Sequence, residues 1–235
     1  MKQEGLPEGV RSLLAKQRGE FLFGNTAPDV QVISGQTRQS THFFDLPIRK
    51  ELPPPWEAFF ANYPFFAQPG SLSSGQAAFL AGYLCHLQAD WLWIREIFGP
   101  VFGLKSHWSN FSHRLYLHNV LRAYLDRQIL PGLNGDVGAS LGLVAVKNWL
   151  PFVIDDHLQQ WRDFLAGQLH PGAYVKTIDV FATRQGLSPQ AYHQLLSSEE
   201  RMDQEVFSRL PRQALVAYRQ QLEEENLRLL RNYLG

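Results

Sequence analysis

The sequence predicts an all-α protein, a single multi-helix domain spanning residues 1–235. Apolar residues recur at helical spacing along most of the chain, and no run shows a convincing strand pattern. Apolar residues make up 45% of the chain and charged residues 19%, which is typical of a globular protein rather than a disordered tail or a coiled coil. At 235 residues the chain is long enough to bury a sizeable core.

The N-terminal half is expected to contain a short helix, an irregular segment and a long helix. Residues 8–19 are expected to be helical. Residues 21–55 are rich in Gly, Pro, Asn, Ser and Thr, so we expect a long irregular segment, which in a compact domain usually has a function. We interpret "WEAFFANYPFF" (56–66) as a packed lid, with an exposed membrane or partner contact as the alternative. Serines in "PGSLSSG" are candidate N-caps for a helix over 75–98, which "GPVFG" should end.

The C-terminal half begins with a second long helix, expected over 106–129 and ended by a Pro-Gly pair. The glycine-rich stretch 131–142 lacks the phosphate-binding consensus patterns, and we interpret it as an ordinary loop. Shorter helices should fill 147–208, and an amphipathic helix over 211–234 should close the fold. Residues 143–235 carry no functional signal that we recognise.

Charge and composition narrow the classes of function. Acidic and basic residues number 22 each, which removes the electrostatic argument for stable nucleic-acid binding. The one cysteine, Cys85, cannot form an internal disulfide, and the first twenty residues contain no secretory apolar core. No apolar run is long enough for a transmembrane helix. We therefore expect a cytoplasmic protein, with a peripheral membrane contact left open and the oligomeric state unknown.

One apolar stretch carries two ionisable residues. "GYLCHLQADWLW" (82–93) places His86 and Asp90 at i, i+4 spacing, on one side of the expected helix, where two ligands can converge on one ion. A carboxylate in apolar surroundings is costly unless it is paired or bound to a metal. Gly82, a costly residue inside a helix, indicates that another segment approaches closely here. An internal His–Asp hydrogen bond, or an arginine partner for Asp90, is the structural alternative.

The irregular segment offers two matching residues. "GNTAPD" ends at Asp29, and "STHFFD" contains His42. Together with His86 and Asp90 they make a nitrogen and oxygen ligand set, which suits zinc, manganese or iron. A metal bound by all four would also hold the segment against the helix. We therefore predict a divalent metal site at these residues.

These stretches also resemble a known family. "FLFGNTAPD", "THFFD" and "AGYLCHLQADWLW" together resemble the zinc-dependent phospholipase C family, whose fold the S1/P1-type nucleases share. The resemblance covers about residues 21–126 and implies a helical fold of the phospholipase C / P1 nuclease type, with one to three ions, chiefly zinc. It further implies that Asp29, His42, His86 and Asp90 hold one ion, that Asp90 bridges to a second ion, and that Asp29 orients or deprotonates the attacking water.

The chain departs from the pattern of that family in two places. No histidine precedes His42, and no His-x-x-x-Glu follows Asp90, so the other metal sites of the family lack their usual ligands. His118, within "LHNVLRAYLD", is the best remaining candidate ligand, with a core histidine as the alternative.

Two arginines are candidate contacts to an anionic substrate, because arginine binds phosphate with two nitrogens. Arg38 lies between Asp29 and His42 in the sequence, and its alternative is a solvated loop residue. Arg122 lies one turn from His118, and its alternative is an ion pair with Asp126.

Three functional hypotheses follow. The first is a metal-dependent hydrolase of phosphoesters, including phospholipids, that uses a metal-activated water. The second is a non-catalytic interaction module in which one structural metal pins residues 21–55 to the helices. The third is a helical scaffold without metal, in which Asp90 pairs with an arginine such as Arg95 or Arg122 and lies away from Asp29.

Overall fold

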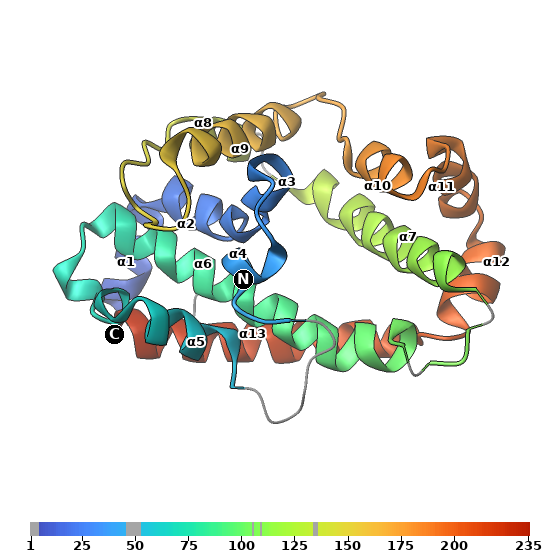
Figure 1. The fold of residues 1–235 in the computed structure, drawn as a ribbon, viewed down its shortest axis with the longest axis horizontal. Helices are drawn as coiled ribbons and strands as arrows, with labels where there is room; N and C mark the ends of the chain where they lie inside the picture. The colour runs from blue at the N-terminus through green and yellow to red at the C-terminus, as the bar shows by residue number, and fades with distance from the viewer. Residues whose placement is uncertain (1–4, 46–52, 105, 109, 134–135) are drawn as a thin grey trace.

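The computed structural model describes residues 5–45, 53–104, 106–108, 110–133 and 136–235. Within these ranges the fold is entirely helical and contains no strand, as the sequence predicts. Figure 1 shows the long helix α6 (Ser74–Leu92) running beside the last helix, α13 (Arg212–Leu234). No helix among the described residues is both long and apolar enough to cross a membrane.

Two large hydrophobic cores hold the helices together. The first surrounds α6, and the second lies against α7 (Phe111–Ile129). Helix α13 joins them, because Leu230 is buried in the first core and Leu215 in the second. The first core also includes side chains of α1 (Glu8–Lys16), α2 (Arg18–Gly24), α5 (Pro55–Asn62), α8 (Val137–Gly142) and α9 (Asp155–Gln168). The second also includes side chains of η5 (Trp93–Phe102), α10 (Thr177–Gln185), α11 (Pro189–Leu196), α12 (Glu199–Met202) and η7 (Asp203–Phe207).

Helices α2 and α6 cross at a pair of glycines. A Cβ atom at Gly82 would lie 2.2 Å from the carbonyl oxygen of Phe21, and one at Gly24 would lie 1.9 Å from that of Phe79. Any larger residue would force the two backbones apart, so the close approach expected at Gly82 is confirmed. This crossing fixes the start of the segment that carries Asp29.

The segment 21–55, expected to be irregular, instead forms several one-turn helices. After α2 come η2 (Ala27–Val30), α3 (Gln31–Ser34) and α4 (Arg38–His42). Gly35, with a φ of 70°, ends α3, and the side chain of Thr37 caps α4 by accepting a hydrogen bond from the backbone N–H of Ser40. The turn-forming residues therefore separate short helices, and residues 46–52 lie outside the described part of the chain.

The first two predicted helices have different boundaries in the structure. Helix 8–19 is interrupted at Gln17, where ψ is 40°. Ser73 caps α6 as expected, and the helix continues past residue 98 as the π-helix η5, which includes Pro100 and ends within "GPVFG" at Phe102. In an α-helix the proline ring would clash with the carbonyl group four residues earlier, and we attribute its acceptance here to the wider π turn.

The second long helix starts later than predicted. Asn110 caps it, so α7 begins at Phe111 rather than at residue 106 and ends at Ile129 as expected. The short helices predicted in 147–208 are present, as is a final helix close to the predicted 211–234.

The glycine-rich stretch 131–142 is not simply a loop, because its second half is α8. A Cβ atom at Gly138 would lie 2.9 Å from backbone atoms of Ala166 and Leu169. Gly138 therefore allows α8 to lie close to α9.

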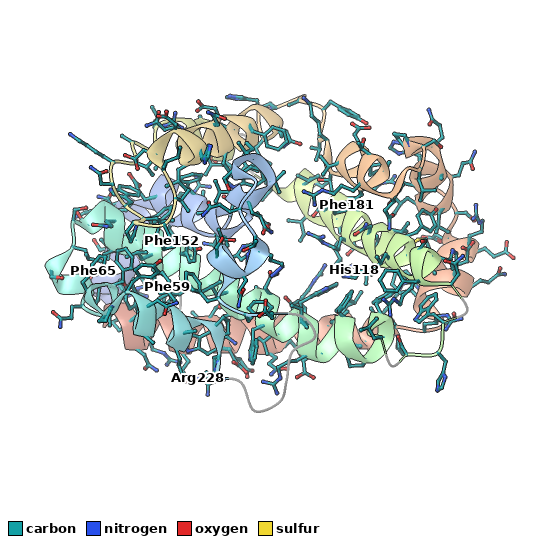
Figure 2. All side chains as sticks on the ribbon, viewed as in Figure 1. Phe59, Phe65, His118, Phe152, Phe181 and Arg228 are labelled. Carbon is teal, nitrogen blue, oxygen red and sulfur yellow. The ribbon has the colours of Figure 1, made fainter. Side chains whose placement is uncertain are left out.

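The aromatic stretch 56–66 contacts the first core. Phe59 and Phe66 are buried, and the ring of Phe59 stacks on Phe66 and on Tyr83 of α6, with centroids 5.3 and 5.6 Å apart. Phe65 is exposed. Figure 2 shows Phe59 and Phe152 on one side of the molecule, far from His118 and Phe181 on the other. The stretch is therefore largely a packed cover, as interpreted from the sequence.

Candidate metal centre

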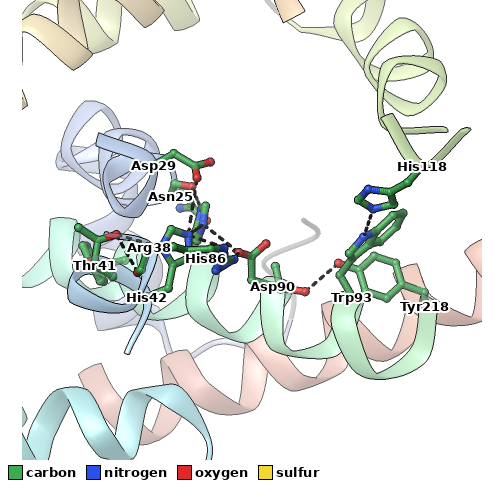
Figure 3. A network of polar contacts seen from close by, with 12 residues as sticks. Asn25, Asp29, Arg38, Thr41, His42, His86, Asp90, Trp93, His118 and Tyr218 are labelled. Atoms are coloured by element: carbon green, nitrogen blue, oxygen red, sulfur yellow. Dashed lines mark hydrogen bonds and ion pairs between the residues drawn. The ribbon is translucent and has the colours of Figure 1, made fainter. Parts of the chain in front are cut away.

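The structure brings four of the predicted metal ligands together. Asp29 lies in η2, His42 ends α4, and His86 and Asp90 project from α6. The Nε2 atom of His42 lies 3.3 Å from Nε2 of His86, 3.6 Å from Oδ1 of Asp29 and 3.4 Å from Oδ2 of Asp90. Figure 3 shows these side chains converging from the short helices and from α6.

Helix α4 is held in place at its C-terminal end. Phe43, the residue after His42, adopts a left-handed backbone conformation with a φ of 61°. Its ring contacts Phe59 and Phe152 edge-on, with centroids 5.2 and 5.4 Å away. The aromatic part of the first core thus anchors the end of α4, and the His42 side chain is fully buried.

Hydrogen bonds on the outer side of each imidazole direct Nε2 inward. Nδ1 of His86 lies 2.8 Å from the carbonyl oxygen of Asn25, which can only accept, so Nδ1 donates. Nδ1 of His42 lies 3.0 Å from the hydroxyl of Thr41. That hydroxyl donates to the carbonyl oxygen of Arg38, so it accepts from His42. Outer partners of this kind set the tautomer of metal-binding histidines.

In the neutral imidazoles both lone pairs therefore lie on Nε2, and the two Nε2 atoms lie 3.3 Å apart beside two carboxylates. Electron-rich atoms at these distances repel unless a proton or a cation lies among them. One ligand atom each from Asp29, His42 and His86 lies within 4.8 Å of the other two. No second group of three or more His, Cys, Asp or Glu with this geometry occurs in the part of the chain that the structure describes.

The pKa shifts of His86 and Asp90 indicate that the two carboxylates favour a positive charge between them. Burial opposes a charge on His86, but Asp90 and Asp29 outweigh it and raise its pKa to about 9. Burial likewise opposes the charge on Asp90, but His86, Arg38 and His42 hold its pKa well below the usual range. Burial, Arg38 and His86 lower the pKa of His42. At neutral pH the cluster therefore holds one proton on His86, which a metal ion would replace.

The cluster has one buried side and one open side. The side chain of His42 has no exposure, whereas those of Asp29 and Asp90 are 39% and 30% exposed. On the open side, Nη2 of Arg38 forms an ion pair with Oδ2 of Asp90. The guanidinium of Arg38 also lies 4.8 Å from the ring centroid of Phe44.

An arginine partner for Asp90, the structural alternative, is present, and Nε2 of His86 also lies 3.6 Å from Oδ2 of Asp90. The scaffold hypothesis is wrong in naming an arginine such as Arg95 or Arg122 and in placing Asp90 away from Asp29. The partner of Asp90 is Arg38 instead. His42 lies within 4 Å of both carboxylates, so the two acids share one site.

His118 does not join the cluster. It lies on α7, where its Nε2 accepts a hydrogen bond from the indole N–H of Trp93 at 2.9 Å (Figure 3). Its ring contacts Phe98 and Phe102, with centroids 4.9 and 5.2 Å away. Burial and the nearby Arg122 lower its pKa to about 3, so it is neutral at physiological pH. This environment matches the alternative of a packed histidine.

Arg122 also lies away from the four converging residues. Its guanidinium lies over the ring of Phe181, 4.8 Å from the centroid. Burial raises the pKa of Asp126, whereas a hydrogen bond from Thr177 and the positive charge of Arg122 lower it, so Arg122 acts on Asp126 electrostatically. Arg122 therefore has a cation–π partner in Phe181, and its predicted contact to a substrate stays a prediction.

Sequence reasoning missed the groups that orient the two histidines. Thr41 stood beside His42 in "STHFFD", so a neighbouring hydroxyl was a usable signal. The acceptor for His86 is the backbone carbonyl group of Asn25. Every residue has such a group, so the sequence could not have indicated this partner. The ion pair between Arg38 and Asp90 depends on the turn of α4 against α6, which no spacing rule gives.

Comparisons with known proteins identify no relative. The chain matches no protein-family model, and neither a curated protein nor a solved structure shows significant similarity to it. No relative therefore assigns a function to the site.

Proposed function

We propose that the protein is a metal-dependent hydrolase of phosphoesters, with one divalent ion, preferably zinc, bound by Asp29, His42 and His86. The observation that carries the proposal is the pair of inward-facing imidazole nitrogens beside two carboxylates. Two histidines and one carboxylate are a ligand set typical of catalytic zinc, which keeps a further position for water.

The chain's own residues have distinct parts in this proposal. When bound, a divalent ion supplies an acidified water and neutralises charge on the phosphoryl oxygens. Thr41 and the carbonyl group of Asn25 hold the two imidazoles as Nε2 donors. The partly exposed carboxylate of Asp29 can orient or deprotonate water, and Asp90 adds negative charge and holds Arg38.

The resemblance over residues 21–126 supports the hydrolytic reaction and the choice of zinc. We propose one ion rather than two or three, because the described residues offer one ligand group. A fold of the phospholipase C / P1 nuclease type is part of the same proposal.

A structural metal is the second candidate, favoured by the way the ligands are distributed. Asp29 and His42 come from one-turn helices, and His86 comes from the rigid α6. An ion bound by all three would pin these short helices in place. The open side of the site argues for the hydrolase, because structural zinc sites are closed by four protein ligands.

The proposal is tested by metal content and by hydrolysis together. Untagged protein grown with added zinc and manganese is analysed for metal content by mass spectrometry, beside His86→Gln and Asp29→Asn, with His113→Gln on α7 as the control. The same samples are assayed on bis(p-nitrophenyl) phosphate, on p-nitrophenyl phosphate and on phosphatidylcholine vesicles.

We expect one equivalent of zinc in the wild type and the control, its loss in both ligand variants, and zinc-dependent hydrolysis of at least one ester. One tightly held ion without hydrolysis of any ester would favour the structural metal. A wild type that binds neither zinc nor manganese would exclude both candidates.

A further inference from the structure

Arg38 has an environment that a simple ion-pair partner does not require. Its Nη2 atom pairs with Asp90, but its Nη1 atom is buried and has no hydrogen-bond partner. A buried N–H group of a charged side chain that lacks an acceptor is costly, so such a group needs an explanation. Phe44 covers one face of the guanidinium and limits its freedom to turn toward solvent.

The position of Arg38 relates it to the metal cluster. Arg38 and His42 stand four residues apart on α4, and both contact Oδ2 of Asp90. The free Nη1 atom therefore belongs to a guanidinium that shares its carboxylate with one of the proposed ligands.

The charges of the site favour an anionic ligand. Asp29 and Asp90 contribute two negative charges, and the guanidinium of Arg38 contributes one positive charge. A divalent ion held by neutral histidines would leave the site with one net positive charge. A purely structural ion gains nothing from a cation beside it, whereas an anion bound there would neutralise the excess.

We propose that Nη1 of Arg38 and the metal cluster together form an oxyanion subsite, which binds a phosphoryl group through two of its unesterified oxygens. The inference rests on the proposed function and deepens it by naming the substrate class. Phosphodiesters carry two such oxygens on one phosphorus and phosphomonoesters carry three, whereas triesters carry only one. One oxygen would accept from Arg38, and another would face the ion.

Replacing Arg38 with lysine distinguishes binding of an anion from simple charge pairing with Asp90. Arg38→Lys keeps the charge that neutralises Asp90 but has no second nitrogen to direct at an anion. Arg38→Gln removes the charge as well. Arg95→Gln is the matched control, because Arg95 is an exposed arginine on η5 that pairs with Glu96, 3.8 Å away.

The probe is inorganic phosphate, titrated by calorimetry into zinc-loaded protein from which unbound zinc has been removed. Zinc content and a thermal melt are recorded for every sample. We expect phosphate to bind the wild type and Arg95→Gln equally, and Arg38→Lys about ten- to a hundredfold more weakly, because one charge-assisted hydrogen bond is lost. In Arg38→Gln binding should fall below detection, while all four proteins hold the same zinc.

The outcomes for the subsite and for the function can be told apart. Zinc-loaded wild type that ignores phosphate, or folded Arg38 variants that bind phosphate as the wild type does, would overturn the subsite and leave the metal site standing. Absence of zinc from the wild type would overturn the proposed function, and the subsite with it.

Discussion

At the scale of single residues, the proton on His86 occupies the place that a metal would take. Asp90 and Asp29, against the effect of burial, raise the pKa of His86 to about 9, so the imidazole is charged at pH 7 in metal-free protein. A ligand imidazole must be neutral, so zinc has to displace this proton. Below pH 9 the affinity for zinc should therefore rise by about tenfold per pH unit, and above pH 9 it should level off.

Competition with a chelator between pH 6 and pH 10 measures this slope. Calorimetry in two buffers of different ionisation enthalpy should give about one proton released per zinc at pH 7, because His42, with its lowered pKa, is already neutral. An affinity that does not change between pH 6.5 and 8 would show that no proton is displaced.

The hydroxyl of Thr41 gives a second prediction at this scale. Thr41→Val keeps the shape of a fully buried side chain but removes the acceptor for Nδ1 of His42. We expect zinc affinity to fall about 10- to 100-fold, the usual effect of losing an outer partner. Ser40→Ala is the control, because that hydroxyl donates to the carbonyl oxygen of Thr37 and touches no ligand. Equal zinc affinity in both variants would argue against the orienting role.

At the scale of elements, the crossing of α2 and α6 positions Asp29. Gly82→Ala would place a Cβ atom 2.2 Å from the backbone of Phe21. Since backbone cannot move aside as a side chain can, we expect a loss of about 3 kcal/mol in the free energy of unfolding. Zinc affinity should fall too, because α2 leads directly to Asn25 and Asp29.

Gly75→Ala on the same helix is the control for this substitution. The nearest atoms there lie 3.6 Å from the added Cβ, an ordinary contact, so the change should be neutral or stabilising by up to about 1 kcal/mol. Urea unfolding of both variants measures the difference. Similar stabilities would mean that the two helices can separate without cost.

The elements also show what the sequence could and could not predict. Long helices such as α6 and α13 repeat their apolar pattern often enough to be recognised. One-turn helices such as α3 and α4 do not, and they form because tertiary contacts hold them rather than through intrinsic propensity. The Gly-Pro pair in "GPVFG" is a common stop signal, and the π-helix through Pro100 is an exception that local patterns do not announce.

The same reasoning explains the candidate site. Asp29, His42, His86 and Asp90 could be chosen from the sequence because ionisable residues in apolar surroundings need a partner. His118 satisfied the same rule, yet its partner is the indole of Trp93. Residue type thus indicates that a partner exists, whereas the three-dimensional arrangement decides which partner it is.

At the scale of the whole molecule, the four converging residues come from elements on the side of the first core. The second core contributes α7 with His118, together with α10, α11, α12 and η7. Two continuous structures connect the cores: α6 with η5, and α13. The division of the core raises the question of whether the chain unfolds as the single domain predicted from its sequence.

The effect of zinc on unfolding can show whether the two cores unfold together. Leu195 is fully buried in the second core, and Leu195→Ala should cost about 2–5 kcal/mol in the free energy of unfolding. Because two helices run through both cores, we expect one unfolding transition. Leu195→Ala should lower the denaturant concentration at its midpoint. Zinc at about 100 times its Kd should then restore about 2.7 kcal/mol of that loss, although it binds at the first core. The affinity of the folded variant for zinc should equal that of the wild type.

Denaturant unfolding of the wild type, Leu195→Ala and Leu158→Ala, with and without zinc, measures these effects. Leu158 is the matched control, a fully buried leucine of the first core. In one domain, zinc raises a single midpoint in all three proteins. The single domain would be contradicted if two unfolding transitions appeared and zinc raised the midpoint only of the one that Leu158→Ala lowers. Stabilising the first core would then leave the stability of the second core unchanged.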